Sequence, residues 1–311
     1  MKTNISLILI LCLLLGACKN GNASSQNKSE TPQDTIKAIK MPAIPQMMTA
    51  PEQRADFLAK HYWDNVNFAD TNYIHHPEVT EQAWADYCDL LNHVPLETAQ
   101  QAMRNVIDRT NVDKKVFTYI TDLADKYLYD PNSPMRNEEF YIPVLEAMIA
   151  SPVLNETEKI RPQARLKLAQ KNRIGTKALN FTYTLASGAQ GSLYQLKAEY
   201  LLLFINNPGC QACTETIEGL KNAPIINQLL QEKKLVLLSI YPDEELDEWK
   251  KHLSEFPKEW INGYDKKFTI KEEQVYDLKA IPTLYLLDKD KTVLLKDATA
   301  PAIEAYLMQH Q

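Results

Sequence analysis

The sequence predicts an all-α helical domain followed by an α/β domain, and two changes along the chain support this division. From residue 51 to about residue 173 the apolar residues recur at helical spacing, whereas short continuous apolar runs alternate with helical stretches after it. The last arginine is Arg173, while lysine continues to the end of the chain. Since 311 residues leave room for about two domains, we expect a helical domain over residues 51–174 and an α/β domain over residues 175–311.

The composition excludes several protein classes. With 45% hydrophobic residues, 24% charged residues and 8 glycines, the chain is neither collagen-like, nor a coiled-coil rod, nor disordered throughout. A formal net charge of -6 gives no electrostatic footprint for nucleic acid, so we expect no nucleic-acid partner. The chain contains 5 cysteines, too few for a disulfide-stapled scaffold of this size.

The first segment, residues 1–17, has the pattern of a secretory signal. Lys2 precedes an apolar run over residues 5–15, which is shorter than the roughly 20 residues that a membrane-spanning helix needs. The end of this run, Leu15-Gly16-Ala17-Cys18, resembles a bacterial lipobox. The resemblance implies cleavage before Cys18 and attachment of lipid to it, which would anchor the chain to a membrane. The alternative is an ordinary signal peptide with an incidental cysteine.

Residues 18–50 predict a flexible tether behind the lipid anchor. They are polar, with scattered proline and no periodicity, and a coil of this length can hold a domain clear of the lipid headgroups. The expected location is therefore the cell envelope, with the domains facing the periplasm. Lys19 follows Cys18, where inner-membrane lipoproteins of well-studied Gram-negative bacteria carry Asp, so the outer membrane is favoured.

The helical domain shows three windows with apolar residues at 3/4 spacing, over residues 96–110, 116–128 and 140–149. Turn signals separate or end them at residues 130–134 and 151–152. Five or six helices in about 120 residues form a small bundle.

Few residues of the helical domain suggest chemistry. His75 and His76 adjoin one another and lack a second ligand pair, so we interpret them as part of a solvated loop. Cys88 shares a helical stripe with Trp84 and Leu91, which predicts a buried core thiol. A third redox cysteine or an intermolecular bridge is the alternative for Cys88.

After residue 174 the chain alternates strands and helices around a Cys-x-x-Cys motif. A hairpin is expected around residues 181–193, turning at Ser187-Gly188. The later elements expected are a buried strand over 200–205, Cys210-Gln211-Ala212-Cys213, a helix over 214–220, a buried strand over 235–240, helices over 243–256 and 270–278, Ile281-Pro282, strands over 284–287 and 293–295, and a helix over 302–308.

The Cys-x-x-Cys motif suits thiol–disulfide chemistry. Cysteines three positions apart around a first helical turn can bond to one another, and unsatisfied N–H groups at the helix start favour a thiolate on the first of them. Cys210 would therefore be the attacking nucleophile, and Cys213 the thiol that resolves the mixed disulfide. A zinc site would need about two further ligands, and this half offers only His252 and His310, so we expect no metal.

This order of elements resembles the thioredoxin fold over residues 175–311. With the lipobox and the extra hairpin, the whole chain is similar to Bacteroidetes lipoproteins in which a helical domain of unknown function precedes an extracytoplasmic thioredoxin-like domain. The resemblance implies a membrane-tethered thiol–disulfide oxidoreductase that reduces or isomerises disulfides, with Cys210, Cys213 and a cis Pro282 at its site. It implies no cofactor beyond the redox-active disulfide, a protein or small thiol/disulfide substrate, and a membrane electron donor.

The sequence departs from the thioredoxin pattern at two positions. Gly209 stands where most of the family has Trp, and Phe204 stands where cytoplasmic thioredoxins have a buried Asp that accepts a proton. Glu244 and Glu245 are nearby candidates for the missing base.

Two other functions remain open at this point. A thiol peroxidase would need Thr at the position of Asn207. A non-catalytic binding module, in which the helical domain captures a protein or glycan, is compatible with the missing Trp and acid.

Overall fold

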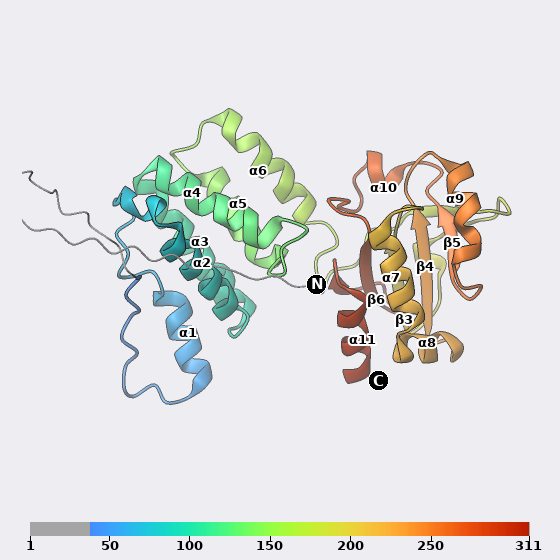
Figure 1. Cartoon of the computed structure of the whole chain (residues 1–311), viewed down its shortest axis with the longest axis horizontal. Coiled ribbons are helices and arrows are strands. Elements are labelled where there is room, and N and C mark those ends of the chain that lie inside the picture. The colour runs from blue at the N-terminus through green and yellow to red at the C-terminus, as the bar shows by residue number, and fades with distance from the viewer. Residues whose placement is uncertain (1–37, 311) are drawn as a thin grey trace, which may run out of the picture. The chain divides into compact units, whose positions relative to one another are not determined.

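The computed structural model describes residues 38–310. They form helices α1–α6, then a mixed sheet with helices packed on it, as the sequence predicts (Figure 1). The expected signal segment and Cys18 lie outside the described residues. None of the helices in the described part of the chain is both long and apolar enough to cross a membrane.

The helical domain contains six α-helices within the described residues. Three of them begin at a capping side chain: Asp113 accepts from the first turn of α4, Asn137 from that of α5, and Asn155 forms a capping box with Glu158 at α6. The bounds are α1 Pro51–His61, α2 Pro77–Leu91, α3 Leu96–Arg109, α4 Lys114–Ala124, α5 Glu138–Ala150 and α6 Glu156–Ala169.

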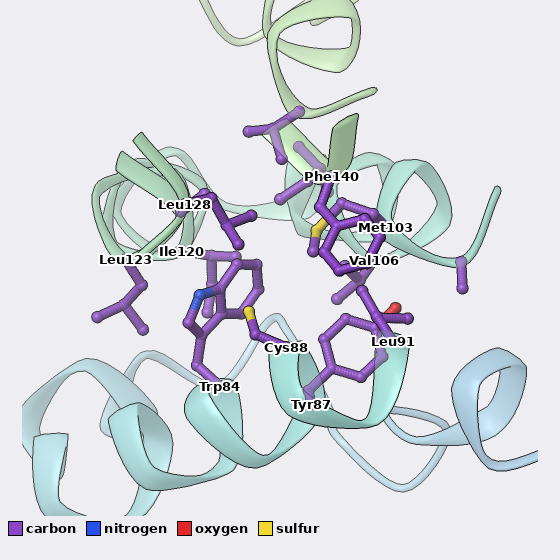
Figure 2. Close-up of a cluster of buried hydrophobic side chains, with 14 of the residues drawn as sticks. Trp84, Tyr87, Cys88, Leu91, Met103, Val106, Ile120, Leu123, Leu128 and Phe140 are labelled. Carbon is purple, nitrogen blue, oxygen red and sulfur yellow. The ribbon is translucent and has the colours of Figure 1, made fainter. Parts of the chain in front are cut away.

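The core of the helical domain gathers around one face of α2. Figure 2 shows Trp84, Tyr87 and Cys88 pointing from this helix toward apolar side chains of the neighbouring helices. Cys88 is 1% exposed, so its interpretation as a core thiol is confirmed. Burial also raises the pKa of this thiol, which keeps it protonated and unreactive.

Residues 38–50, the described end of the expected tether, run along the helical domain. Ile39 packs against its core, and the backbone carbonyl of Lys40 accepts a hydrogen bond from the Asn65 amide at 2.9 Å. Further on, His75 is exposed, and the ring of His76 lies 3.0 Å from Glu78 at the start of α2.

The second domain is built on a sheet with strand order β2-β1-β5-β4-β3-β6-β7. Strands β3, β4 and β5 are parallel to one another, whereas β6 runs antiparallel to β3. The bounds are β1 Thr182–Leu185, β2 Gln190–Ser192, β3 Tyr200–Ile205, β4 Leu235–Tyr241, β5 Ile261–Tyr264, β6 Thr283–Asp288 and β7 Val293–Lys296.

Both faces of this sheet are covered, which explains the continuous apolar run of β3. Leu202 and Phe204 face a core shared with the helices α7 (Gln211–Lys221), α8 (Pro224–Gln231) and α11 (Ala300–Gln309). Leu201, Leu203 and Ile205 face a second core that includes Phe181 and Tyr276. Alternate side chains of one strand thus serve two separate cores.

The structure differs from the sequence-based prediction at four elements of this domain. Strand β5 and helix α8 were not predicted from the sequence. The helix expected over residues 243–256 is shorter, α9 Leu246–His252, and it ends in a 3-10 turn. The helix expected over residues 270–278 is a single turn, α10 Thr269–Glu272, because Phe268 before it and Gln274 after it adopt positive φ angles of 54° and 50°, which an α-helix cannot accommodate.

Candidate functional site

The cysteine motif lies where β3 leads into α7. Cys210 is the N-cap residue of α7, at the end of the helix where the backbone N–H groups have no partner within the helix, although its sulfur makes no capping bond to them. Gly209, immediately before it, has a φ of +71°, and this left-handed backbone turns the chain from the sheet into the helix. The position where most thioredoxins carry Trp is therefore one that favours glycine here.

The two thiols of the motif have different environments. Cys210 is half-buried, while Cys213, one turn into α7, is only 1% exposed, and both are free thiols in the structure. Burial raises the pKa of Cys213; the backbone N–H of Asn207 opposes this change, and the neighbouring Cys210 adds to it. Cys210 is thus the accessible thiol, and Cys213 is held protonated behind it.

Pro282 lies beside Cys210 because of the register between β3 and β6. Ile205, at the end of β3, pairs with Thr283, at the start of β6. This pairing brings the segment before β6 next to the loop that follows β3. The Ile281-Pro282 peptide bond is cis, and the sulfur of Cys210 lies 3.9 Å from the carbonyl oxygen of Ile281. The structure therefore brings together Cys210, Cys213 and Pro282, the three residues that the sequence analysis expects at the redox site.

Among residues 38–310, no carboxylate contacts the cysteine motif in the way that the buried acid of cytoplasmic thioredoxins does. Phe204 packs in the core against Trp260, with ring centroids 6.3 Å apart. Glu244 and Glu245 are both exposed, and they line a cavity of about 430 Å³ together with Asn207. Neither makes a hydrogen bond to the cysteine motif among the described contacts.

Asp243 is a carboxylate linked to the cysteine loop that the sequence analysis missed. Its Oδ2 accepts from the Asn207 amide at 3.0 Å, and its Oδ1 accepts from the Lys271 ammonium at 2.7 Å. The signal was available, because β3 and β4 were both predicted and the residues following parallel neighbouring strands share one sheet edge. Asn207 thus contacts both groups: its side-chain amide donates to the Asp243 carboxylate, and its backbone N–H donates to the Cys213 sulfur.

Comparisons with known proteins match both halves of the chain. Residues 17–172 match the model of a domain of unknown function, DUF5106, which is half of the chain, and residues 198–293 match a thioredoxin-like family model. A crystal structure of a thioredoxin-like protein from Bacteroides caccae is 84% identical, with a TM-score of 0.87; the match covers 89% of this chain and 100% of that one.

Other solved structures match the second domain alone. The C-terminal domain of an uncharacterized protein from Bacteroides fragilis is 70% identical over 44% of this chain and 98% of its own, with a TM-score of 0.44. The thioredoxin domain of a thiol-disulfide oxidoreductase from Bacteroides vulgatus is 20% identical over 44% of this chain and 97% of its own, with a TM-score of 0.40. No curated protein matches the sequence. The chain belongs to the family of proteins with a DUF5106 domain, and in it this helical domain is followed by a thioredoxin-like domain.

Proposed function

We propose that the protein is a thiol–disulfide oxidoreductase that uses Cys210 and Cys213 to reduce or isomerise disulfides. The observation that carries this proposal is the arrangement of the two thiols: the half-buried Cys210 occupies the N-cap position of α7, and the buried Cys213 lies one turn behind it. An attacking thiol needs access and a stabilised thiolate, whereas a resolving thiol must stay protonated until a mixed disulfide has formed.

Reduction of a substrate then takes two exchange steps. The Cys210 thiolate bonds to one substrate sulfur, the substrate S–S bond breaks, and the departing thiolate takes up a proton. Cys213 loses its proton and bonds to the Cys210 sulfur, which releases the second substrate thiolate to take up a proton in turn. Two electrons have passed to the substrate, and the protein holds a Cys210–Cys213 disulfide. A dithiol donor at the membrane would reverse these steps and restore the reduced pair.

Isomerisation would use the same site in cases where Cys213 resolves the mixed disulfide slowly. Because burial raises the pKa of Cys213, few of these thiols are ionised at neutral pH and the mixed disulfide persists. A second thiol of the same substrate then has time to attack the mixed disulfide, which forms a new substrate disulfide and frees Cys210 with no net electron transfer.

We further propose that lipid on Cys18 anchors the chain to the outer membrane with both domains facing the periplasm. The DUF5106 match begins at residue 17, so the apolar run over residues 5–15 lies outside it, in agreement with a removable signal. A Cys18→Ser variant expressed in a lipoprotein-processing bacterium should move from the membrane fraction to the soluble fraction. Retention of this variant in the membrane would contradict the anchor.

Trapping variants test the catalytic proposal. Cys213→Ser should accumulate covalent complexes with substrate proteins, and dithiothreitol should separate these complexes by reducing the mixed disulfide. Cys210→Ser should have no disulfide reductase activity. The matched control is the double variant, which should trap nothing. If Cys213→Ser also traps nothing, and partners bind all variants equally, the protein is a binding module. Thiol-dependent consumption of hydrogen peroxide would indicate a peroxidase instead.

A further inference from the structure

We propose that the helical domain supplies one wall of the substrate pocket of the redox site, and that this pocket selects disulfides flanked by an apolar residue of an extended polypeptide. The inference rests on the proposed function and adds a role for the DUF5106 domain, which takes part in selecting the substrate.

A cavity of about 500 Å³ adjoins the cysteine motif and carries residues from both domains. Ala212, between the two cysteines, and Ile281-Pro282 line it on the thioredoxin-like side. Pro131, Asn132 and Arg136, from the segment that precedes α5, line it on the helical side. A cavity of this size has room for the side chains of a few residues of a bound polypeptide. The cysteines themselves do not line the cavity, but Ala212 lies between them and the carbonyl oxygen of Ile281 lies 3.9 Å from the Cys210 sulfur, so the cavity adjoins the redox site.

Arg136 holds the helical wall in place. Its guanidinium donates to the backbone carbonyl of Asp297 at 2.7 Å and lies 3.8 Å from the Asp297 carboxylate. The side chains of Arg136 and Asp297 are 20% and 8% exposed, so this contact is largely shielded from water. A charge-assisted bond in such a place is stronger than a surface ion pair. The segment 131–136 is therefore fastened to Asp297, in the short connection between β7 and α11 of the thioredoxin-like domain.

A buried ion cluster fixes the same two walls behind the cavity. Glu138, in the first turn of α5, accepts from Lys279 at 3.0 Å and also pairs with Lys296, and Lys279 further contacts Asp277 and Asp297 at 3.2 and 3.6 Å. Burial alone would lower the pKa of Lys279, but the three carboxylates raise it above its ordinary value, so Lys279 stays charged. Since Lys279 comes shortly before Pro282 in the sequence, the cluster ties α5 to the segment that faces Cys210.

The residues of the cavity favour an apolar occupant. Its wall consists largely of small or apolar side chains, such as Ala212, Pro282, Leu284 and Pro301. The Arg136 charge is already engaged by Asp297, and Glu215 is an exposed residue that accepts from Gln211 at 2.9 Å. An anionic side chain would meet the Glu215 carboxylate and an Arg136 guanidinium that already pairs with Asp297, so it would lose hydration without gaining a free cationic partner. An apolar side chain next to the substrate cysteine gains free energy by entering.

The test compares two substrate peptides, each with one cysteine as a mixed disulfide with 5-thio-2-nitrobenzoate and with either Leu or Asp on both sides of that cysteine. The reduced wild-type protein should release thiolate from the Leu peptide with a kcat/KM at least about tenfold above that for the Asp peptide. Asn132→Trp fills the cavity from the helical side and should bring this ratio close to one. The matched control is Pro134→Trp, in the same segment but outside the cavity wall, which should keep the wild-type ratio.

A wild-type ratio near one, an unchanged ratio in Asn132→Trp, or an equal fall in the control would each overturn the inference. Thr216→Phe fills the same cavity from α7 and takes the place of Asn132→Trp if that variant does not fold. If the wild-type protein exchanges thiols with neither peptide, nor with the symmetric disulfide of 5-thio-2-nitrobenzoate, the proposed function itself has failed. Failure of the pocket inference alone would leave both peptides reacting at similar rates.

Discussion

The sulfur of Cys210 lies 3.9 Å from the carbonyl oxygen of Ile281, a residue 71 positions further along the chain. This contact follows from the sheet, because β3 ends beside the start of β6 in antiparallel register. The Ile281-Pro282 segment therefore lies next to any group bonded to the Cys210 sulfur. The helical domain contacts the same region through Glu138 and Lys279.

The unequal burial of the cysteines predicts a simple alkylation pattern. A form of the protein that begins at residue 19 lacks Cys12 and Cys18 and keeps Cys88, Cys210 and Cys213. In the reduced, native protein we expect iodoacetamide to modify Cys210 alone, since the other two thiols are buried and protonated. Mass spectrometry after short exposure checks this. Modification of Cys88 at a similar rate would contradict the core assignment.

The resolution step should accelerate with pH. The pKa of Cys213 is raised chiefly by its burial, a cause that persists when Cys210 is held in a mixed disulfide. Below a raised pKa, the thiolate fraction grows about tenfold per pH unit, so the rate of resolution should grow about tenfold per unit between about pH 7 and 9. The readout is the second, slower release of thiolate when the reduced protein reacts with an aromatic disulfide. A rate that stays constant over this range would exclude a buried, protonated resolving thiol.

The buried ion cluster predicts a large loss of stability on removal of its central carboxylate. Glu138→Gln leaves Lys279 and Lys296 without a charged partner that both share, and such a change typically costs about 3 kcal/mol of unfolding free energy. Urea unfolding measures it. Glu146→Gln, at an exposed position of the same helix, is the control and should change the stability by less than about 0.5 kcal/mol. Equal effects of the two variants would show that the cluster does not hold the domains.

Two glycines near the site should respond to alanine in opposite directions. Gly209 has a φ of +71° with no atom near the added methyl group, so Gly209→Ala pays backbone strain alone, about 1 kcal/mol. Gly219 lies inside α7, where the added methyl group would meet its nearest atom at an ordinary 3.7 Å, so Gly219→Ala should stabilise the protein by up to about 1 kcal/mol. Urea unfolding of the two variants and the wild-type protein measures both changes in stability. A neutral or stabilising Gly209→Ala would contradict the left-handed turn before Cys210.

The sequence alone predicted the elements whose apolar pattern is strong and continuous. The run over residues 200–205 identified β3, and the cysteines after it located the site. The strand β5 escaped prediction because Asn262 and Gly263 leave it without an alternating or continuous apolar pattern. The early end of α10 depends on the positive φ of Gln274, which residue type does not reveal.

Contacts between distant segments explain what else the sequence analysis missed. The pairing of Asn207 with Asp243 requires two strand ends to be placed side by side. The position of Arg136 beside Asp297 joins residues 161 positions apart, and no spacing rule connects them. For the same reason, no pattern in the helical half of the sequence shows that Pro131, Asn132 and Arg136 line the cavity next to Ala212 and Pro282.

A redox titration of the form that begins at residue 19, against mixtures of reduced and oxidised glutathione, tests the central claim most directly. The reduced fraction is read by alkylation and mass spectrometry at each cysteine. The account predicts one reversible two-electron transition confined to Cys210 and Cys213, with Cys88 reduced throughout, and a midpoint between roughly -270 and -120 mV. A pair that stays reduced or oxidised across the titration, or two cysteines that react with glutathione independently, would contradict it.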